Sequence, residues 1–142
     1  MTLALGLLSI LSAYAVMKIS SPAALTRGSQ AETLASDLRR AQALAYTSGR
    51  RMRFSITSSG ANGSYAVACT TGSTPCGSDF TGALSQGASL GSGSALYFNT
   101  LGQPSNVNGI PLGSSTSYSV SVGGVSTTVS VAAQTGRVTV GP

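Results

Sequence analysis

The first 17 residues, MTLALGLLSILSAYAVM, form an uncharged and largely apolar run. A helix needs roughly 20 apolar residues to cross a membrane, and about 17 is the lower limit. One interpretation is a cleaved secretory signal, but the basic n-region that such a signal carries does not precede Met1. A buried core helix is a second interpretation, although a domain this small rarely encloses a helix that is apolar on every side.

We favour a helix that crosses a membrane or packs in the core of a filament. Gly6, Ser9 and Ala13 are small enough to let neighbouring helices approach closely. The residues expected to pack against lipid or neighbouring helices are the large apolar ones: Leu3, Leu7, Leu8, Ile10, Leu11 and Val16.

Apolar positions recur every three or four residues over 30–48, which predicts an amphipathic helix. Pro22 and Gly28 are expected to weaken or kink a helix that continues from Met1. Gly49 predicts its end, because glycine readily adopts the left-handed conformation. A helix over residues 1–48 would be about 70 Å long, so half of it must protrude from the domain. Its predicted buried face consists of Ala31, Leu34, Leu38, Ala41 and Ala45.

After Gly49 the apolar residues alternate with polar ones, which predicts strands with one buried face. Gly123-Gly124 predicts a hairpin. Residues 58–63 and 134–136 are predicted turns, and the Gly/Ser-rich stretch 77–94 is expected to be a loop. The predicted strands cover residues 51–57, 65–69, 95–99, 117–122, 125–131 and 137–140.

These elements predict an α+β fold, in which a long N-terminal α-helix packs on an antiparallel β-sheet head. We expect three regions. Residues 1–21 are the transmembrane or filament-core half of the helix, residues 22–49 its amphipathic half, and residues 50–142 the β-rich globular head.

Charged residues make up only 8% of the 142 residues, and there is no histidine. This composition excludes a Ser-His-Asp triad and histidine-ligated metal sites. Three carboxylates (Glu32, Asp37 and Asp79) are too few for a carboxylate metal cage, and two cysteines are too few for an all-cysteine zinc site. We therefore expect no enzyme activity, no cofactor and no metal.

The charges that remain are concentrated in one segment. Residues 18–53 carry seven positive and two negative side chains, a net of +5, whereas Asp79 and Arg137 cancel in the rest of the chain. The apolar run and residues 54–142 of the head therefore present nearly neutral surfaces, as expected of parts that contact other copies or lipid.

Cys69 and Cys76 are separated by six residues. We predict a disulfide, because an exported domain would meet an oxidising compartment. Two free buried thiols are the alternative. In the chain-entropy model, closing so short a loop stabilises the fold by about 2–3 kcal/mol at most.

Three stretches resemble the type IV pilin and type II secretion pseudopilin superfamily. Residues 7–16, LLSILSAYAV, look like the apolar helix core of that superfamily. Residues 34–45, LASDLRRAQALA, are similar to the matching segment of the H-type pseudopilins and the FimT- and FimU-like minor pilins. The ending TGRVTV at residues 135–140 looks like the last strand of the same group.

The resemblance implies a structural subunit of a type IV pilus-like or type II secretion pseudopilus filament. Such a subunit sits in the inner membrane as a single-pass protein and then joins a periplasmic or extracellular filament. The implied partners are other copies, related pilins, the inner membrane and the assembly machinery. Family precursors carry a basic leader and a glutamate near the mature start, and neither is present here. The family's glutamate-based assembly contact is therefore assigned to no residue.

A minor pilin that binds DNA for uptake is the alternative function. Some FimT-like proteins use a C-terminal Gly-Arg-x-Arg signature, and Gly136-Arg137 keeps only its first arginine. Arg50, Arg51 and Arg53 would add to the site if they lie on the same face. One arginine supplies about one phosphate contact, whereas non-specific affinity needs several.

Overall fold

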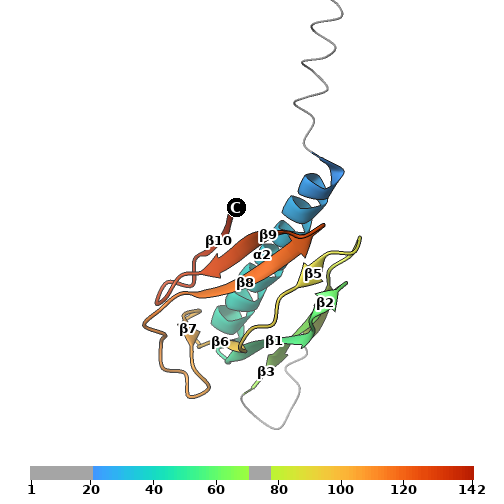
Figure 1. Ribbon diagram of the computed structural model, residues 1–142. Coiled ribbons are helices and arrows are strands. Elements are labelled where there is room, and N and C mark those ends of the chain that lie inside the picture. Colours follow the sequence, from blue (N-terminus) through green and yellow to red (C-terminus); the bar gives the residue numbers. More distant parts are fainter. Residues whose placement is uncertain (1–20, 71–77) are drawn as a thin grey trace, which may run out of the picture.

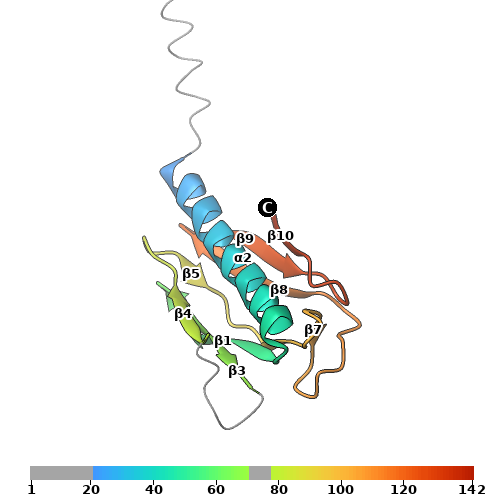
Figure 2. The same cartoon turned by 180° about the vertical axis from the view of Figure 1, so that it is seen from behind.

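The computed structural model describes residues 21–70 and 78–142, and Figure 1 shows their arrangement. One helix, α2 (Pro22–Ser48), lies against two antiparallel sheets of five strands each. It contacts β8, β9 and β10 of one sheet and β1 and β6 of the other. Figure 2 shows the same arrangement from behind, with α2 lying across the strands. The predicted α+β arrangement of a helix on antiparallel sheets is confirmed.

Each sheet is named here after its central long strand. The β1 sheet has the order β4-β3-β1-β6-β7, and the β8 sheet has the order β10-β9-β8-β5-β2. The strands of the β1 sheet are β1 (Met52–Ser58), β3 (Ser64–Cys69), β4 (Phe80–Ala83), β6 (Leu96–Phe98) and β7 (Pro104–Ser105). Those of the β8 sheet are β2 (Gly60–Ala61), β5 (Ser89–Leu90), β8 (Thr116–Val122), β9 (Val125–Val131) and β10 (Val138–Gly141).

The sequence explains both ends of α2. The hydroxyl of Ser21 accepts the N–H of Ala24 at 3.3 Å, and Pro22 occupies the first helical turn, where its missing N–H costs nothing. Gly49 ends the helix in the left-handed conformation, as predicted. Helix α2 begins at Pro22 and continues through Gly28 without interruption. The expected weakening or kink at Pro22 concerns a helix that continues from Met1, and residues 1–20 lie outside the described residues.

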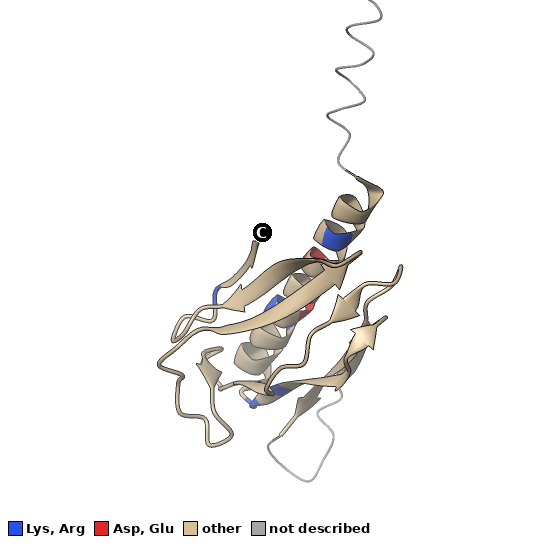
Figure 3. Cartoon of the chain, in the orientation of Figure 1, with Lys and Arg blue, Asp and Glu red and all other residues tan. Residues whose placement is uncertain are grey.

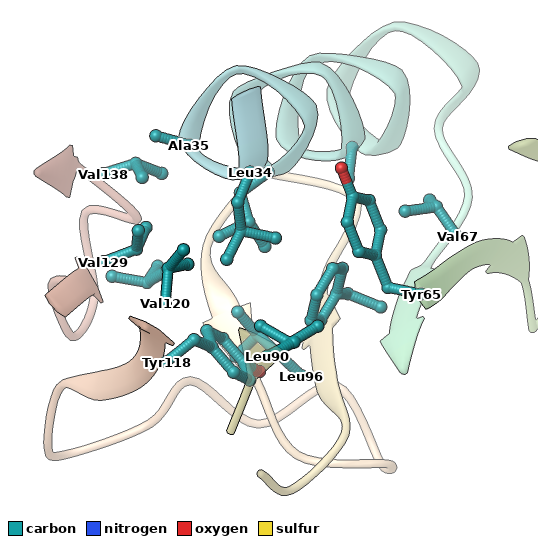
Figure 4. Close-up of a cluster of buried hydrophobic side chains, with 14 of the residues drawn as sticks. Leu34, Ala35, Tyr65, Val67, Leu90, Leu96, Tyr118, Val120, Val129 and Val138 are labelled. Carbon is teal, nitrogen blue, oxygen red and sulfur yellow. The ribbon is translucent and has the colours of Figure 1, made fainter. Parts of the chain in front are cut away.

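One face of α2 fills the space between the two sheets. The five predicted residues of this face are all fully buried, which confirms the helical pattern. In Figure 4, Leu34 points from the helix between Val120 and Val129 on one side and Tyr65 on the other. The ring of Phe54 lies 5.3 Å from that of Tyr65 and 5.0 Å from that of Tyr118, so aromatic contacts also join the two sheets.

All six predicted strands are present, but four further short strands, β2, β4, β5 and β7, were not predicted. The expected loop over 77–94 contains β4 and β5, and the expected turn over 58–63 contains β2. These segments hold two to four residues, too few for an alternating pattern to stand out. Glycine is uncommon inside strands, so Gly82 gave no sign of β4. It fits there because the ring of Tyr65 packs directly over it and leaves no room for a side chain.

The expected single-pass location in the inner membrane is corrected by the structure. Within the described residues, no helix is long and apolar enough to cross a membrane. The physical reason is composition, since α2 carries five charged side chains. The apolar segment 1–17, on which the expectation was based, lies outside the described residues, as do its predicted packing residues from Leu3 to Val16.

The burial of α2 predicts that Leu38→Ala will lower the free energy of unfolding by about 2–5 kcal/mol, because the cavity cannot collapse between two sheets. Leu25→Ala is the matched control. Its side chain is 64% exposed on the same helix, and we expect a change within about 0.5 kcal/mol. Urea unfolding of both variants measures the difference. Equal effects would contradict the docking of this helix face.

Candidate functional site

Gln42, near the C-terminal end of α2, joins the helix to two distant loops. Its Nε2 donates to the carbonyl of Gly102 at 2.8 Å and to that of Thr135 at 3.1 Å. Gly136 is buried beside it with φ +71°, and a Cβ on Gly136 would lie 2.4 Å from Gln42 Nε2. Only glycine therefore fits between the Gln42 amide and the neighbouring chain. We call this arrangement the Gln42 clasp.

Arg39 holds the same C-terminal segment at a second point. Its guanidinium donates to the carbonyl of Val138 at 3.2 Å and lies 3.6 Å from the carboxylate of Glu32 in an exposed ion pair. Residues 34–45 and 135–140, two of the three stretches named for a family resemblance, are therefore in direct contact through Arg39 and Gln42.

Arg40 contacts the other sheet, the β1 sheet. Its guanidinium carbon lies 4.3 Å from the ring centre of Phe80 in β4, within the range of a cation–π contact. Consecutive arginines on one helix thus reach an end strand of each sheet, β10 on one side and β4 on the other.

Gln30 forms a second link between α2 and a loop. It is buried, its Nε2 donates to the Ser85 hydroxyl at 3.1 Å, and its Oε1 accepts the Ser85 N–H at 2.9 Å. Thr26 donates to the Oε1 of Gln86 at 3.0 Å one turn earlier. Sequence analysis missed both glutamines of α2. The available signal was their position beside Ala31 and Ala41, where a polar side chain faces the core and must find partners.

The four arginines of the DNA-binding alternative lie in two separate segments, each next to a different sheet. Arg137 is exposed just before β10, whereas Arg50 and Arg51 directly precede β1 and Arg53 lies within it (Figure 3). The Arg51 guanidinium donates to the carbonyl of Val107, and that of Arg53 lies 6.0 Å from the ring centre of Tyr97. The structure therefore does not place these arginines on one sheet.

Cys69 is disulfide-bonded, and Cys76, the only other cysteine, lies outside the described residues. The carboxylate of Asp79 accepts the N–H of Cys69 at 3.0 Å, so it ties the end of β3 to the start of β4. Within the part of the chain that is described, no group of three His, Cys, Asp or Glu side chains could hold a metal ion.

Two buried tyrosines have perturbed hydroxyls. Burial, together with a 2.6 Å hydrogen bond donated to Asp37, raises the pKa of Tyr65 well above its usual value. Burial alone raises the pKa of Tyr118, whose hydroxyl donates to the carbonyl of Ser94 at 3.0 Å. Both hydroxyls are neutral donors in the folded protein, which suits them to a structural role.

The outward face of β8 and β9 is built from hydroxyl side chains. The hydroxyls of Ser117 and Ser130 are 3.0 Å apart, and those of Ser121 and Ser126 are 2.6 Å apart. The strand register places Ser119 opposite Thr128 between these pairs. We call these six residues the hydroxyl face. It offers neutral hydrogen-bonding groups to a neighbouring surface.

No family model, no curated protein and no solved structure matches this chain.

The Gln42 clasp predicts that Gly136→Ala will destabilise the fold by about 2 kcal/mol or more, because a clash is added to a strained φ. Gly124→Ala measures the cost of the strained φ alone, because Gly124 has φ +81° and open space around it. We expect this substitution to cost about 1 kcal/mol of unfolding free energy. Gly141→Ala, with open space and no strained φ, should be nearly neutral. Thermal and urea unfolding rank the three variants, and a Gly136 variant no worse than the Gly124 variant would exclude the clash.

The raised tyrosine pKa values predict a loss of stability at high pH. The folded state keeps the protons of Tyr65 and Tyr118 to a higher pH than the unfolded chain, whose tyrosines have a pKa of about 10. The tyrosine contribution to the free energy of unfolding is therefore complete below pH 10 and declines above it. Urea unfolding between pH 8 and pH 11 measures this. In the double variant Tyr65→Phe, Tyr118→Phe, the decline should become shallower.

Proposed function

We propose that this protein is a structural subunit of a pilin-like filament, assembled from copies of itself or from related subunits. The single observation that carries the proposal is the contact between residues 34–45 and 135–140. Each stretch on its own resembles the same superfamily, and Gln42 and Arg39 bind the carbonyls of Thr135 and Val138. Two such stretches that bind each other support the proposal better than either stretch does alone.

The surfaces of the head suit a subunit that lies beside others. The hydroxyl face carries no charged side chain, so contact with a neighbour leaves no ion without its water or a partner. The outward residues Ser117 and Ser130 already bond to each other, which lowers the cost of removing water from them.

The apolar N-terminal sequence supplies the assembly contact in this proposal. Residues 1–17 contain no charge, and burying such a segment against neighbouring copies is favourable by roughly 25 cal/mol per Å² of apolar surface. The chain enters the head at Ser21, at the beginning of α2, so a contact made by this segment leaves both sheets available on the outside.

The DNA-binding alternative gains no support. Arg137 lies in a different sheet region from Arg50, Arg51 and Arg53, and Arg51 already binds the carbonyl of Val107. Several phosphate contacts on one face are needed for useful non-specific affinity.

The proposal predicts that the full chain forms filaments of uniform width, whereas a chain shortened to residues 21–142, which keeps the Ser21 cap of α2, stays monomeric. Negative-stain electron microscopy and analytical sedimentation distinguish the two results. The shortened chain should keep the unfolding midpoint of the full chain, because the described core begins after Pro22. Filaments formed by the shortened chain would contradict assembly through the N-terminal segment. A full chain that stays monomeric at high concentration would contradict the proposed function.

A further inference from the structure

Strand β10 ends the β8 sheet with one side of its backbone unpaired. It pairs with β9 in the register Val138↔Val131, Thr139↔Ser130 and Val140↔Val129. Hydrogen-bonded and non-hydrogen-bonded pairs alternate along an antiparallel ladder. The N–H of Ala132 donates to the carbonyl of Arg137 at 2.9 Å, so the pairs formed by Val138 and Val140 are the non-hydrogen-bonded ones.

The backbone groups of Val138 and Val140 therefore point away from β9, toward the open edge. An independent contact supports this assignment, because Arg39 reaches the carbonyl of Val138 from α2. Among the described residues, the N–H and C=O of Val140 have no partner. An unpaired edge of this kind is a template for another extended segment.

The other sheet edges are less suitable. Strands β2 and β7 have two residues each, and the Arg40 side chain lies over Phe80 at the β4 edge. Strand β10 has four residues, Val-Thr-Val-Gly, with no proline or charge of its own to block pairing.

Two arginines flank this edge. Arg137 is exposed directly before β10, and Arg39 lies at Val138 with its side chain 48% exposed. The Arg39–Glu32 pair is a surface ion pair, worth about 0–1 kcal/mol, so Arg39 remains able to bind another carboxylate. The charge at the edge therefore favours an extended segment with acidic side chains.

The chain itself offers no such segment. Its only acidic side chains are Glu32 and Asp37 in α2 and Asp79, whose carboxylate is bound to the N–H of Cys69. A second copy would therefore bring no acidic strand to this edge.

We propose that the β10 edge receives an extended, acidic segment of a different protein, which adds a sixth strand to the β8 sheet. The outward N–H and C=O of Val140 bond to the added backbone. A carboxylate of the partner binds Arg137 or Arg39. This is recognition by strand addition, and it does not depend on filament assembly.

The probe is a fluorescein-labelled, amidated peptide of sequence Glu-Val-Thr-Val-Thr-Glu, with the same peptide carrying Lys for both Glu as its matched control. Fluorescence anisotropy with the full chain should give binding at least tenfold tighter for the acidic peptide. In hydrogen-exchange NMR, the Val140 amide should exchange fast in the free chain and at least tenfold more slowly with the acidic peptide. The Thr139 amide, which faces β9, should be protected in both states.

Two variants locate the site. Val140→Pro removes the outward N–H but leaves the β9 ladder intact, and proline is tolerated on an edge strand, so binding should be lost while the fold remains. Arg39→Gln combined with Arg137→Gln should weaken binding at least tenfold, whereas Arg53→Gln on the other sheet should not change it. If the Val140→Pro variant does not fold, the arginine variants still test whether the acidic peptide binds at the β10 edge.

Three results would overturn the proposal. One is a Val140 amide already protected in dilute free chain. Another is protection that rises with protein concentration alone, which would assign the edge to a second copy. The third is equal or absent binding of the acidic and basic peptides.

Discussion

The burial of one helix face against two sheets is the interaction on which the rest of this structure depends. Alanines at 31, 35, 41 and 45 bring the strands close to the α2 backbone, and Leu34 and Leu38 fill the space between the sheets. Helix α2 contacts the central strands of both sheets. Without that shared face, each sheet would expose its own row of aromatic and branched side chains, so neither sheet is a stable unit alone.

The polar side chains of α2 form hydrogen bonds that fix how the helix docks on the two sheets. Gln30 binds Ser85, Asp37 accepts the hydroxyl of Tyr65, and Gln42 joins the loops at Gly102 and Thr135. Each bond joins residues at least 28 positions apart in sequence. Leaving such a buried group unpaired is costly, so these bonds favour one docking geometry over neighbouring ones. The helix therefore sets the positions of loops that have little regular structure of their own.

The sequence was informative wherever a pattern was long enough to repeat. The helix face from Ala31 to Ala45 and the alternation in β8 and β9 each provide several matching positions, and these elements were predicted correctly. The two-residue strands β2, β5 and β7 have no repeat to detect, and only pairing with distant partners such as Leu90 and Val120 defines them.

The candidate site could not be predicted from sequence for the same reason: no repeated local pattern marks its residues. Arg39, Gln42 and Gly136 each have an unremarkable local context, and their roles arise from contacts across more than 90 residues. The family resemblance indicated both segments without showing that they bind each other. Composition, by contrast, identified the lack of charge on the head, because that property needs no knowledge of contacts.

The position of α2 also determines how the head would respond to mechanical force. The chain enters at Ser21 and continues directly into the helix, so tension on the N-terminal side is applied along the helix axis. The strands of both sheets would then resist as one body in shear, with the Gln30 and Gln42 bonds loaded together with the apolar face. Many contacts must slip at the same time before the helix moves, whereas a pull that peels β10 from the sheet edge would break one ladder bond after another. This head is therefore expected to withstand a pull through its N-terminal side better than one through its C-terminal side.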